Sequence, residues 1–409
     1  MNVPFFRPSI SQADIAEVVA CMESGWLTTG PRTKAFEEAF AQYVGAKHAI
    51  ALNSCTAALH LALEAVGVRR GDLVLVPALT FAATAEVVRY FDAIPVFVDA
   101  DPVTLCMDPV AAANTAAAIR RGERLPGMTL PYGPMKAIIP MHYGGQMVDV
   151  DAIAAVAREH GLAIIDDAAH TLPAHYRAGA DQPWRAVGST ADVTCFSFYA
   201  NKCITTGEGG MALTNRDDLA ERMRIMSLHG MSKDAWKRFS SKGSWYYEIV
   251  APGFKYNMTD VAAALGVAQL ARADELLAAR ASVAQRFIAG LEDVPEVDAP
   301  TELPDRRHSW HLFSVQLRLD RLTITRSQFI EEMKARGVAA SVHWLPLHMQ
   351  PYYIQTYGYA ASDFPVAAGI WPRLVSLPIF PAMTDEEVDH VIGVVREVAR
   401  QHSAPAKKG

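Results

Sequence analysis

Short apolar runs alternate with amphipathic, helix-like stretches over about the first 280 residues of the chain. In the helix-like stretches apolar residues recur at helical spacing, as Phe36, Phe40 and Tyr43 do, and Gly161 marks the end of another such stretch. The apolar runs are rich in Val and Ile, which is typical of strands buried on both faces of a sheet. This alternation predicts a mostly parallel sheet covered by helices. The predicted strands are residues 48–52, 73–77, 94–98, 136–140, 162–166, 193–198 and 210–214.

The pattern changes after Thr259. An Ala- and Leu-rich stretch predicts one long helix that begins at this capping residue and ends near Gly290. We therefore predict two domains, a large one over residues 1–284 and a smaller α+β one over residues 285–409. The elements predicted in the smaller domain are a strand at 312–317, a helix at 326–335 and a last helix from Thr384, whose capping partner is Glu387, to about residue 401.

Composition narrows the class of protein. The chain has 409 residues, of which 51% are hydrophobic and 20% charged, and its net charge of −6 argues against a nucleic-acid or anionic-membrane surface. The five cysteines form no CxxC pair, so we expect neither a zinc site nor a disulfide framework. The N-terminus lacks the pattern of a signal peptide, and no stretch is long and apolar enough to span a bilayer. These features predict a cytoplasmic protein.

Three segments at strand ends carry candidate chemistry, and the carboxyl ends of parallel strands can bring such segments together. The first, residues 53–58, joins a predicted strand to a helix, where free backbone amides suit an anion such as phosphate. As an isolated motif it would more simply be an ordinary helix cap. The second contains Asp166, Asp167 and His170. A carboxylate at the end of a buried strand must be paired, either as a cap for the next helix or as the partner of a bound cation.

The third segment places Lys202 shortly after a buried strand, among small and aromatic residues. A lysine there either reaches solvent or is partly desolvated, and desolvation makes it a Schiff-base nucleophile. A phosphate-binding helix start, a carboxylate and a lysine together are the parts of a pyridoxal phosphate (PLP) site, in which the carboxylate holds the pyridine nitrogen protonated.

The sequence resembles the DegT/DnrJ/EryC1/StrS aminotransferases, PLP enzymes that act on nucleotide-linked keto-sugars. The resemblance runs from about Pro4 to the final helix. It implies PLP-dependent transferase fold type I, with a seven-stranded, mostly parallel large domain and a smaller C-terminal one, and a homodimer whose subunits share each active site. The segments that carry it are GWLTTGPRTKAFEEAFAQYVGAKHAIALNSCTAALHLAL, PALTFAATAEVV, PVFVDADPVTLCMD, IIDDAAHTLPA, FSFYANKCITTGEGGM and PGFKYNMTDVAAALG.

The resemblance assigns the cofactor site residue by residue. Lys202 matches the Schiff-base lysine and Asp167 the partner of the pyridine nitrogen, so both are the expected catalytic residues. His170 falls beside the PLP 3-hydroxyl, and Phe81 matches the aromatic residue that stacks on the ring.

The resemblance also assigns the residues that bind the phosphate of PLP. Cys55, Thr56 and Ser197 match the residues that bind the PLP phosphate, although a smaller residue is usual in place of Cys55. Lys255 stands where many relatives carry Asn, at a position that reaches the phosphate held by the neighbouring subunit. A lysine can serve there as a point charge.

The reaction implied is transfer of an amino group from glutamate to a nucleotide-linked keto-sugar, most simply at C4 of a 4-keto-6-deoxy hexose, in amino-sugar, surface-polysaccharide or glycan biosynthesis. A PLP-dependent sugar dehydratase and a non-enzymatic regulator on the same fold stay open as alternatives. Lys202 argues against the first and the complete set of cofactor residues against the second. We expect no metal. The expected substrate contacts are Trp26, Thr28, Thr29, His142, Tyr143, Tyr199, His343 and His348, of which Trp26 and His348 could equally be packing residues.

Overall fold

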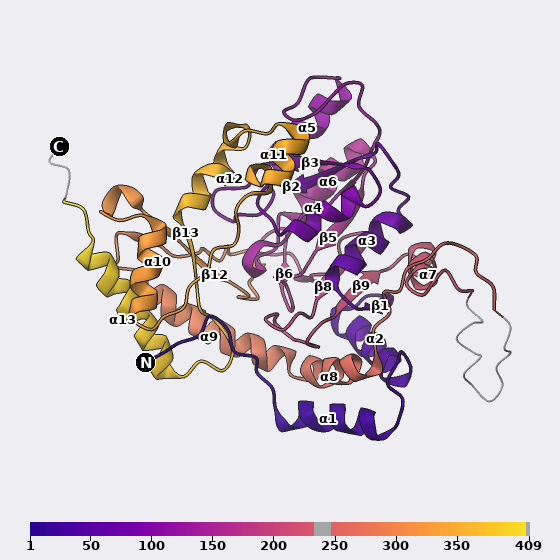
Figure 1. Ribbon diagram of the computed structural model, residues 1–409, viewed down its shortest axis with the longest axis horizontal. Helices are drawn as coiled ribbons and strands as arrows, with labels where there is room; N and C mark the ends of the chain where they lie inside the picture. The colour runs from indigo at the N-terminus through magenta and orange to yellow at the C-terminus, as the bar shows by residue number, and fades with distance from the viewer. Residues whose placement is uncertain (233–246, 406–409) are drawn as a thin grey trace.

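The computed structural model describes residues 1–232 and 247–405, and its centre is a seven-stranded sheet (Figure 1). Among the described strands of this sheet, β9 is antiparallel to both of its neighbours, and the other adjacent pairs are parallel. The predicted mostly parallel sheet of seven strands is confirmed. In sheet order the strands are β1 (His48–Leu52), β9 (Gly210–Thr214), β8 (Val193–Ser197), β5 (Ala163–Asp167), β4 (Met135–Ile138), β2 (Leu73–Pro77) and β3 (Ile94–Val98).

Helices cover this sheet and pack on one another. α3 contacts α4 and α7, α5 contacts α6, and α8 packs on both α1 and α2. The helical spacing of the α2 aromatics explains its packing, because Phe36 and Phe40 are both fully buried against Phe198, and Phe40 also meets Phe196 on β8. The helices are α1 (Gln12–Glu23), α2 (Pro31–Val44), α3 (Cys55–Ala65), α4 (Ala82–Arg89), α5 (Pro109–Arg120), α6 (Val150–His160), α7 (Asp217–Met226) and α8 (Asp260–Ala271).

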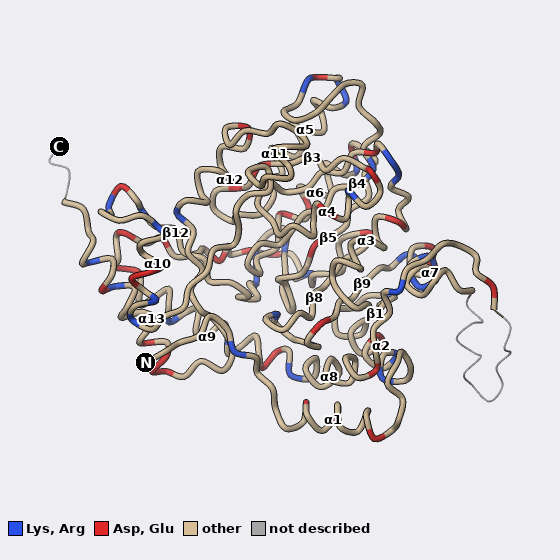
Figure 2. The backbone as a smooth tube through the Cα atoms, viewed as in Figure 1, with Lys and Arg blue, Asp and Glu red and all other residues tan. Residues whose placement is uncertain are grey.

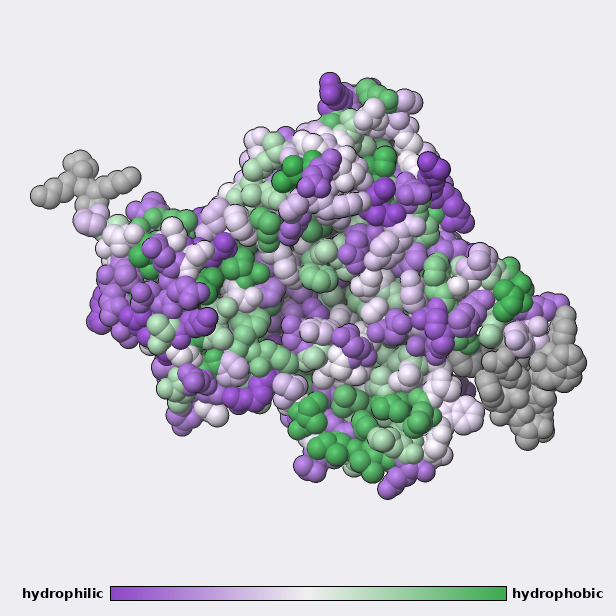
Figure 3. Space-filling view, in the orientation of Figure 1, coloured by the Kyte–Doolittle hydropathy of each residue, from purple (hydrophilic) through white to green (hydrophobic). Residues whose placement is uncertain are grey.

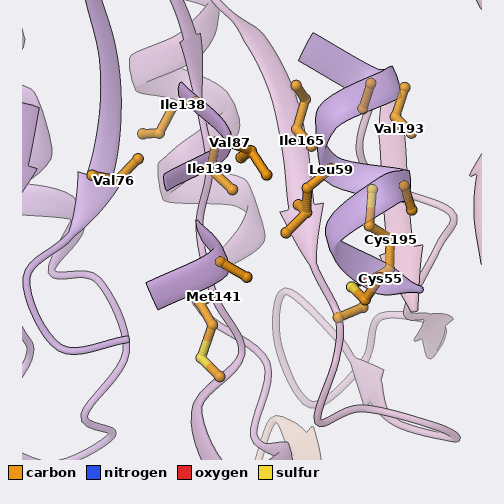
Figure 4. Packing of buried hydrophobic residues seen from close by; sticks show 14 of the residues in the cluster. Cys55, Leu59, Val76, Val87, Ile138, Ile139, Met141, Ile165, Val193 and Cys195 are labelled. Carbon is orange, nitrogen blue, oxygen red and sulfur yellow. Dashed lines mark hydrogen bonds between the residues drawn. The ribbon is translucent and has the colours of Figure 1, made fainter. Parts of the chain in front are cut away.

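The buried core reaches the carboxyl ends of the central strands. Figure 4 shows Cys55 and Leu59 of α3 beside Ile165 of β5 and Cys195 of β8. These side chains are buried, so the start of α3 is fixed against the two strands whose ends carry Asp167 and Ser197. Packing of this kind fixes the relative positions of three segments that are far apart in the sequence.

A second core lies in the C-terminal part of the chain. A three-stranded antiparallel sheet packs there with α9, α10 and α13, and Phe287, Phe313 and Phe329 are fully buried between them. The predicted caps are present, since Thr384 and Glu387 form a capping box at the start of α13. The elements are α9 (Ala273–Leu291), β10 (Val297–Asp298), β12 (Phe313–Leu317), α10 (Arg326–Ala335), β13 (Leu374–Leu377) and α13 (Asp385–Gln401).

One predicted element is corrected. The helix expected from Thr259 to about Gly290 is two helices, α8 and α9, separated at Arg272, whose backbone is not helical (φ −109°, ψ 8°). The Arg272 guanidinium binds the carboxylate of Asp14 at 3.2 Å and that of Glu275 at 2.9 Å. The partner Asp14 lies 258 residues away in the sequence, so the local pattern does not reveal this break.

The segment after His343 returns to the larger core. Tyr353 and Tyr359 pack on Phe97 of β3, with ring centroids 5.0 and 5.3 Å apart, and α11 and α12 lie near β3 and α5 in Figure 1. The predicted boundary between the two domains, at residues 284 and 285, falls inside α9 and stays a prediction. The remaining elements are α11 (Pro351–Tyr357), α12 (Pro365–Ile370), a small sheet of β11 (Arg306–Arg307), β6 (His175–Tyr176) and β7 (Arg185–Ala186), and 3-10 turns at Tyr143–Gly145, Leu319–Arg321, Leu347–Met349, Ala361–Asp363 and Trp371–Arg373.

The surface combines interspersed charges with one apolar face. Basic and acidic residues are interspersed over the described chain (Figure 2). α1 exposes Ile15, Val19 and Met22, which contribute to the hydrophobic area at the lower edge of Figure 3. No helix within the described ranges is long and apolar enough to cross a membrane.

Candidate active site

Lys202 lies in the loop that follows β8, and its amine points into a cavity of about 390 Å³. The Nζ atom is 3.4 Å from Nε2 of His311. Burial disfavours the ammonium form and lowers the pKa of Lys202 to about 8, although the nearby carboxylate of Asp167 acts in the opposite direction. The lysine is therefore much closer to neutrality at physiological pH than a lysine in water.

Asp167 ends β5 with only 3% of its surface exposed. Its Oδ2 accepts a hydrogen bond from Thr84 Oγ1 at 2.7 Å, and its Oδ1 accepts one from the backbone amide of Ala169 at 3.2 Å. Thr84 uses its only hydroxyl proton in this bond, so Thr80 must donate in the 2.6 Å contact between the two hydroxyls. Burial raises the pKa of Asp167, and the two hydrogen bonds and Lys202 oppose that rise.

Asp166 has different surroundings from its neighbour. Its Oδ2 accepts a hydrogen bond from Thr194 Oγ1 at 3.4 Å and lies 3.6 Å from Nε2 of His142. Nδ1 of His142 accepts the amide of Val148, so the imidazole proton is on Nε2 and faces Asp166. Adjacent residues of a strand point to opposite sides, and of the two carboxylates Asp167 lines the cavity.

The start of α3 forms another wall of the cavity. Ser54 caps the helix by accepting the amide of Ala57, and the preceding amides of Cys55 and Thr56 have no intrahelical acceptor. The Cys55 thiol is directed to the carbonyl of Cys195 at 3.5 Å, so Cys55 is suited to offer its amide rather than its sulfur. A Cβ on Gly210 would lie 2.3 Å from the Ser54 carbonyl carbon, and glycine therefore allows β9 to approach this helix start.

Aromatic and histidine rings close the cavity. His170 accepts the amide of Gly144 at Nδ1 (3.2 Å), which leaves its proton on Nε2, and its ring lies 5.2 Å from that of Trp344. The ring of Phe81 is 55% exposed and lies 6.0 Å from Trp344. Burial, with the nearby positive charge of Lys202, holds the pKa of His170 well below its usual range, so this imidazole is neutral.

The structure brings most of the expected cofactor residues to one place. The expected residues that line the cavity are Cys55, Thr56, Phe81, Asp167, His170, Ser197, Tyr199, Lys202 and His343. Sequence reasoning missed three groups in or beside it: His311, Trp344 and Thr84. Trp344 follows the expected His343 directly, and Thr84 is one helical turn after Phe81, so their neighbours gave a signal. His311 had no comparable signal, because none of its immediate neighbours in the sequence was an expected site residue.

Of the expected substrate contacts outside this cavity, three are buried in the protein interior. His142 is fully buried beside Asp166, and the Tyr143 hydroxyl donates to the carbonyl of His343 at 2.6 Å. His348 is also fully buried, with its ring 4.7 Å from that of Phe364. In the sequence, His142 and Tyr143 follow a predicted strand and His348 lies near His343. The side chains of all three turn into the protein interior.

The N-terminal loop and Lys255 also gather away from the cavity of their own chain. Asn257 Nδ2 donates to the hydroxyl of Thr29 at 2.6 Å, and the Lys255 amine contacts the side-chain oxygen of Asn257. Trp26 Nε1 donates to the carbonyl of Thr29 at 3.2 Å, and the carbonyl of Thr28 accepts the amide of Asp260. These residues do not line the cavity that Lys202 enters.

Comparisons with known proteins give one consistent answer. The sequence model of the DegT/DnrJ/EryC1/StrS aminotransferase family matches residues 8–396. The chain is 44% identical over 399 residues to the spore coat polysaccharide biosynthesis protein SpsC of Bacillus subtilis, with 97% of each chain covered. Its structure is similar to the PLP-form of the putative sugar aminotransferase Spr1654 from Streptococcus pneumoniae (TM-score 0.85, 31% identity, 98% of this chain and 99% of the other). It is also similar to Helicobacter pylori PseC, an aminotransferase involved in the biosynthesis of pseudoaminic acid (TM-score 0.85, 26% identity, 98% and 100% covered).

Proposed function

The chain belongs to the DegT/DnrJ/EryC1/StrS aminotransferase family, and we propose that it transfers an amino group from glutamate to a nucleotide-linked keto-sugar. The family, the fold class, the PLP-dependent aminotransferase class and its cofactor, all predicted from the sequence, are confirmed by the comparisons. The observation that carries the proposal is the meeting of Lys202, Asp167 and the start of α3 in one cavity.

The residues of the cavity fit PLP. The free amides of Cys55 and Thr56, together with the hydroxyl of Ser197, suit the phosphate at the positive end of α3. Asp167 suits the pyridine nitrogen, because a buried carboxylate whose remaining bonds are satisfied by Thr84 and Ala169 needs a cationic partner.

Two further groups suit the ring and its hydroxyl. His170 presents a protonated Nε2, which is a donor for the 3-hydroxyl oxygen, and the exposed ring of Phe81 is available for stacking. PLP supplies an electron sink for the bonds that are made and broken at the amine-bearing carbon.

Lys202 is the proton carrier of the site. Its pKa of about 8 leaves a useful fraction uncharged near neutrality, so the amine could move a proton from the donor carbon to the cofactor, and in the second half of the reaction a proton from the cofactor to the sugar carbon. Asp167, ionised beside such a cation, would keep the pyridine nitrogen of bound PLP protonated. Trp344, His311 and Phe81 line the cavity and would leave less room for water around the reacting centre.

The sugar is proposed as a 4-keto-6-deoxy hexose linked to a nucleotide. SpsC is a polysaccharide biosynthesis protein and PseC acts in pseudoaminic acid biosynthesis, which supports a sugar acceptor. Tyr199 and His343 line the cavity and are the proposed sugar contacts. Because all five cysteines are free and buried, we infer that the reaction takes place in the cytoplasm.

The enzyme is proposed to be a homodimer with shared sites. The apolar face of α1 lacks a described covering element and suits a second copy. In such a dimer Lys255 and the loop with Trp26, Thr28 and Thr29 would belong to the site of the partner subunit, which explains why they gather outside their own cavity.

The test is a two-step measurement on the PLP-loaded protein. Glutamate alone should remove the absorbance of the PLP-bound form, and addition of the correct nucleotide-linked keto-sugar should restore it. A panel that varies the nucleotide and the keto position identifies the acceptor. Failure of glutamate and other amino acids to change the absorbance would contradict the transaminase and favour a dehydratase or a regulator.

A further inference from the structure

His311 reaches the active-site lysine from the C-terminal part of the chain. It lies just before β12, is 5% exposed, and brings Nε2 to 3.4 Å from Lys202 Nζ. Its other ring nitrogen, Nδ1, is buried and has no hydrogen-bond partner within the described residues. The ring also packs against that of His170, with centroids 4.2 Å apart and the ring planes tilted by 46°. A buried histidine with one contact to a reacting amine requires an explanation beyond packing.

The backbone around His311 is clamped on both sides. The Ser309 amide donates to the carbonyl of Gly145 at 3.0 Å, and its hydroxyl donates to the carbonyl of His170 at 2.6 Å. On the other side the Leu312 amide donates to the carbonyl of Gly144 at 3.0 Å. Glycine is required at position 145, because a Cβ there would lie 2.3 Å from Ser309 Oγ, and its φ is +117°.

A buried cation holds the residue before His311. Arg280 of α9 is 1% exposed, and its Nη1 donates to the carbonyls of Trp310 at 3.3 Å and Ile379 at 3.0 Å. No carboxylate pairs with Arg280 within the described residues. Its charge therefore acts on the neighbouring site and disfavours further positive charge on both Lys202 and His311.

We propose that His311 is a positioning residue for Lys202, whose amine donates a hydrogen bond to Nε2 of the neutral imidazole and is thereby held toward the cofactor position. This inference rests on the proposed function and adds a residue to the catalytic machinery. It assigns the proton of His311 to Nδ1, because Nε2 is the acceptor. The side chain of a lysine has several rotatable bonds. A fixed acceptor therefore reduces the number of conformations that its amine can adopt.

The electrostatic surroundings favour this role over proton exchange between the two residues. Burial holds the pKa of His311 well below its usual range, and the charges of Lys202 and Arg280 and the neighbouring His170 and His343 act in the same direction. The groups that face Lys202 with the opposite effect are Asp167, Cys55 and Cys203. His311 thus accepts a hydrogen bond without accepting the proton.

The experiment measures how fast Lys202 captures PLP, which needs neither glutamate nor sugar. The full-length protein is freed of cofactor and mixed with PLP, and formation of the bound chromophore is followed by absorbance. His311→Leu removes the acceptor at similar size, and His311→Gln keeps an acceptor near the position of Nε2. His390→Leu is the control, because it removes a histidine of α13 whose hydrogen bond, to the carbonyl of Arg336, lies outside the cavity.

We expect His311→Leu to slow the capture about 10- to 100-fold, the usual cost of a misplaced reacting group. His311→Gln should recover a large part of the rate, and His390→Leu should match the wild type. A wild-type capture rate in His311→Leu would overturn the inference, as would equal loss in the Leu and Gln variants. A wild-type protein that captures PLP rapidly but ignores glutamate would instead contradict the proposed function.

Discussion

Thr84 Oγ1 donates a hydrogen bond to Asp167 Oδ2 at 2.7 Å, and Thr80 in turn donates to Thr84. Both threonines are fully buried, so the relay fixes the orientation of the carboxylate that is proposed to bind the pyridine nitrogen. α4 carries Thr84 on the turn that follows Phe81, and one short helix therefore orients both the charge partner and the stacking ring of the cofactor.

Thr84→Val removes this hydrogen bond while it keeps the shape of the side chain. Loss of a hydrogen bond to a charged group costs about 1.5–3 kcal/mol, so we expect PLP affinity or kcat to fall about 10- to 100-fold. Thr84→Ser keeps the hydroxyl and should stay near the wild type. Equilibrium binding of PLP and steady-state kinetics on the three proteins check the prediction, and identical behaviour of the Val and Ser variants would contradict it.

Asp167→Asn and Asp166→Asn separate the roles of the adjacent carboxylates. We expect Asp167→Asn to lose most activity, because a neutral amide cannot hold the ring nitrogen protonated. Asp166→Asn disturbs the buried contact with His142 and should mainly lower the melting temperature. Kinetics and thermal melts of both variants test the assignment. A larger loss of kcat in Asp166→Asn would show that the two roles are reversed.

The pH dependence of PLP capture follows from Lys202. Its uncharged amine is the nucleophile, and the fraction of that form rises with pH through the pKa of about 8. The capture rate of the cofactor-free protein should therefore increase from pH 6, reach half of its maximum near pH 8 and level off above about pH 9. A lysine with its ordinary pKa would give a rate that still increases steeply above pH 9. Absorbance stopped-flow measurements in buffers of constant ionic strength distinguish the two profiles.

Lys255 tests the proposed dimer. If it binds the phosphate of PLP in the partner subunit, Lys255→Ala should weaken PLP binding by about 1.5–3 kcal/mol. A solvated surface lysine would cost almost nothing. Lys255→Ala is then mixed with Lys202→Ala under conditions that allow subunit exchange.

In that mixture each hybrid dimer has one site with both lysines and one site with neither. Wild-type PLP affinity and activity should return in the intact sites. Unchanged PLP affinity of Lys255→Ala, or an active monomer, would refute the arrangement.

Features of the fold that depend on neighbouring residues could be predicted from the sequence, and features that depend on distant contacts could not. Buried strands such as β2 and caps such as Thr384 were predicted because the pattern and the structure depend on the same neighbouring residues. The break at Arg272 was not, since it involves a contact with Asp14 that only the folded chain creates. The same reasoning applies to α11 and α12, which return to the large core through Phe97.

The site shows the same limit. Asp167 ends β5 and Lys202 lies in the loop that follows β8, where a charged residue in an apolar context is conspicuous. His311 lies 109 positions after Lys202 in a different part of the fold, so only the structure brings the two together. For His142 and His348 the sequence indicated the neighbourhood but not the direction of the side chain, and both turn away from the cavity.

The central claim is that Lys202 carries the amino-transfer chemistry in this cavity. The most direct measurement compares wild type and Lys202→Ala, both saturated with PLP. The first readout is the glutamate-dependent loss of cofactor absorbance, and the second is steady-state turnover with the keto-sugar that the panel identifies. The account predicts rapid conversion by the wild type and none by Lys202→Ala, with unchanged melting temperature and with PLP still held through its phosphate contacts. Near-normal turnover by Lys202→Ala would contradict it.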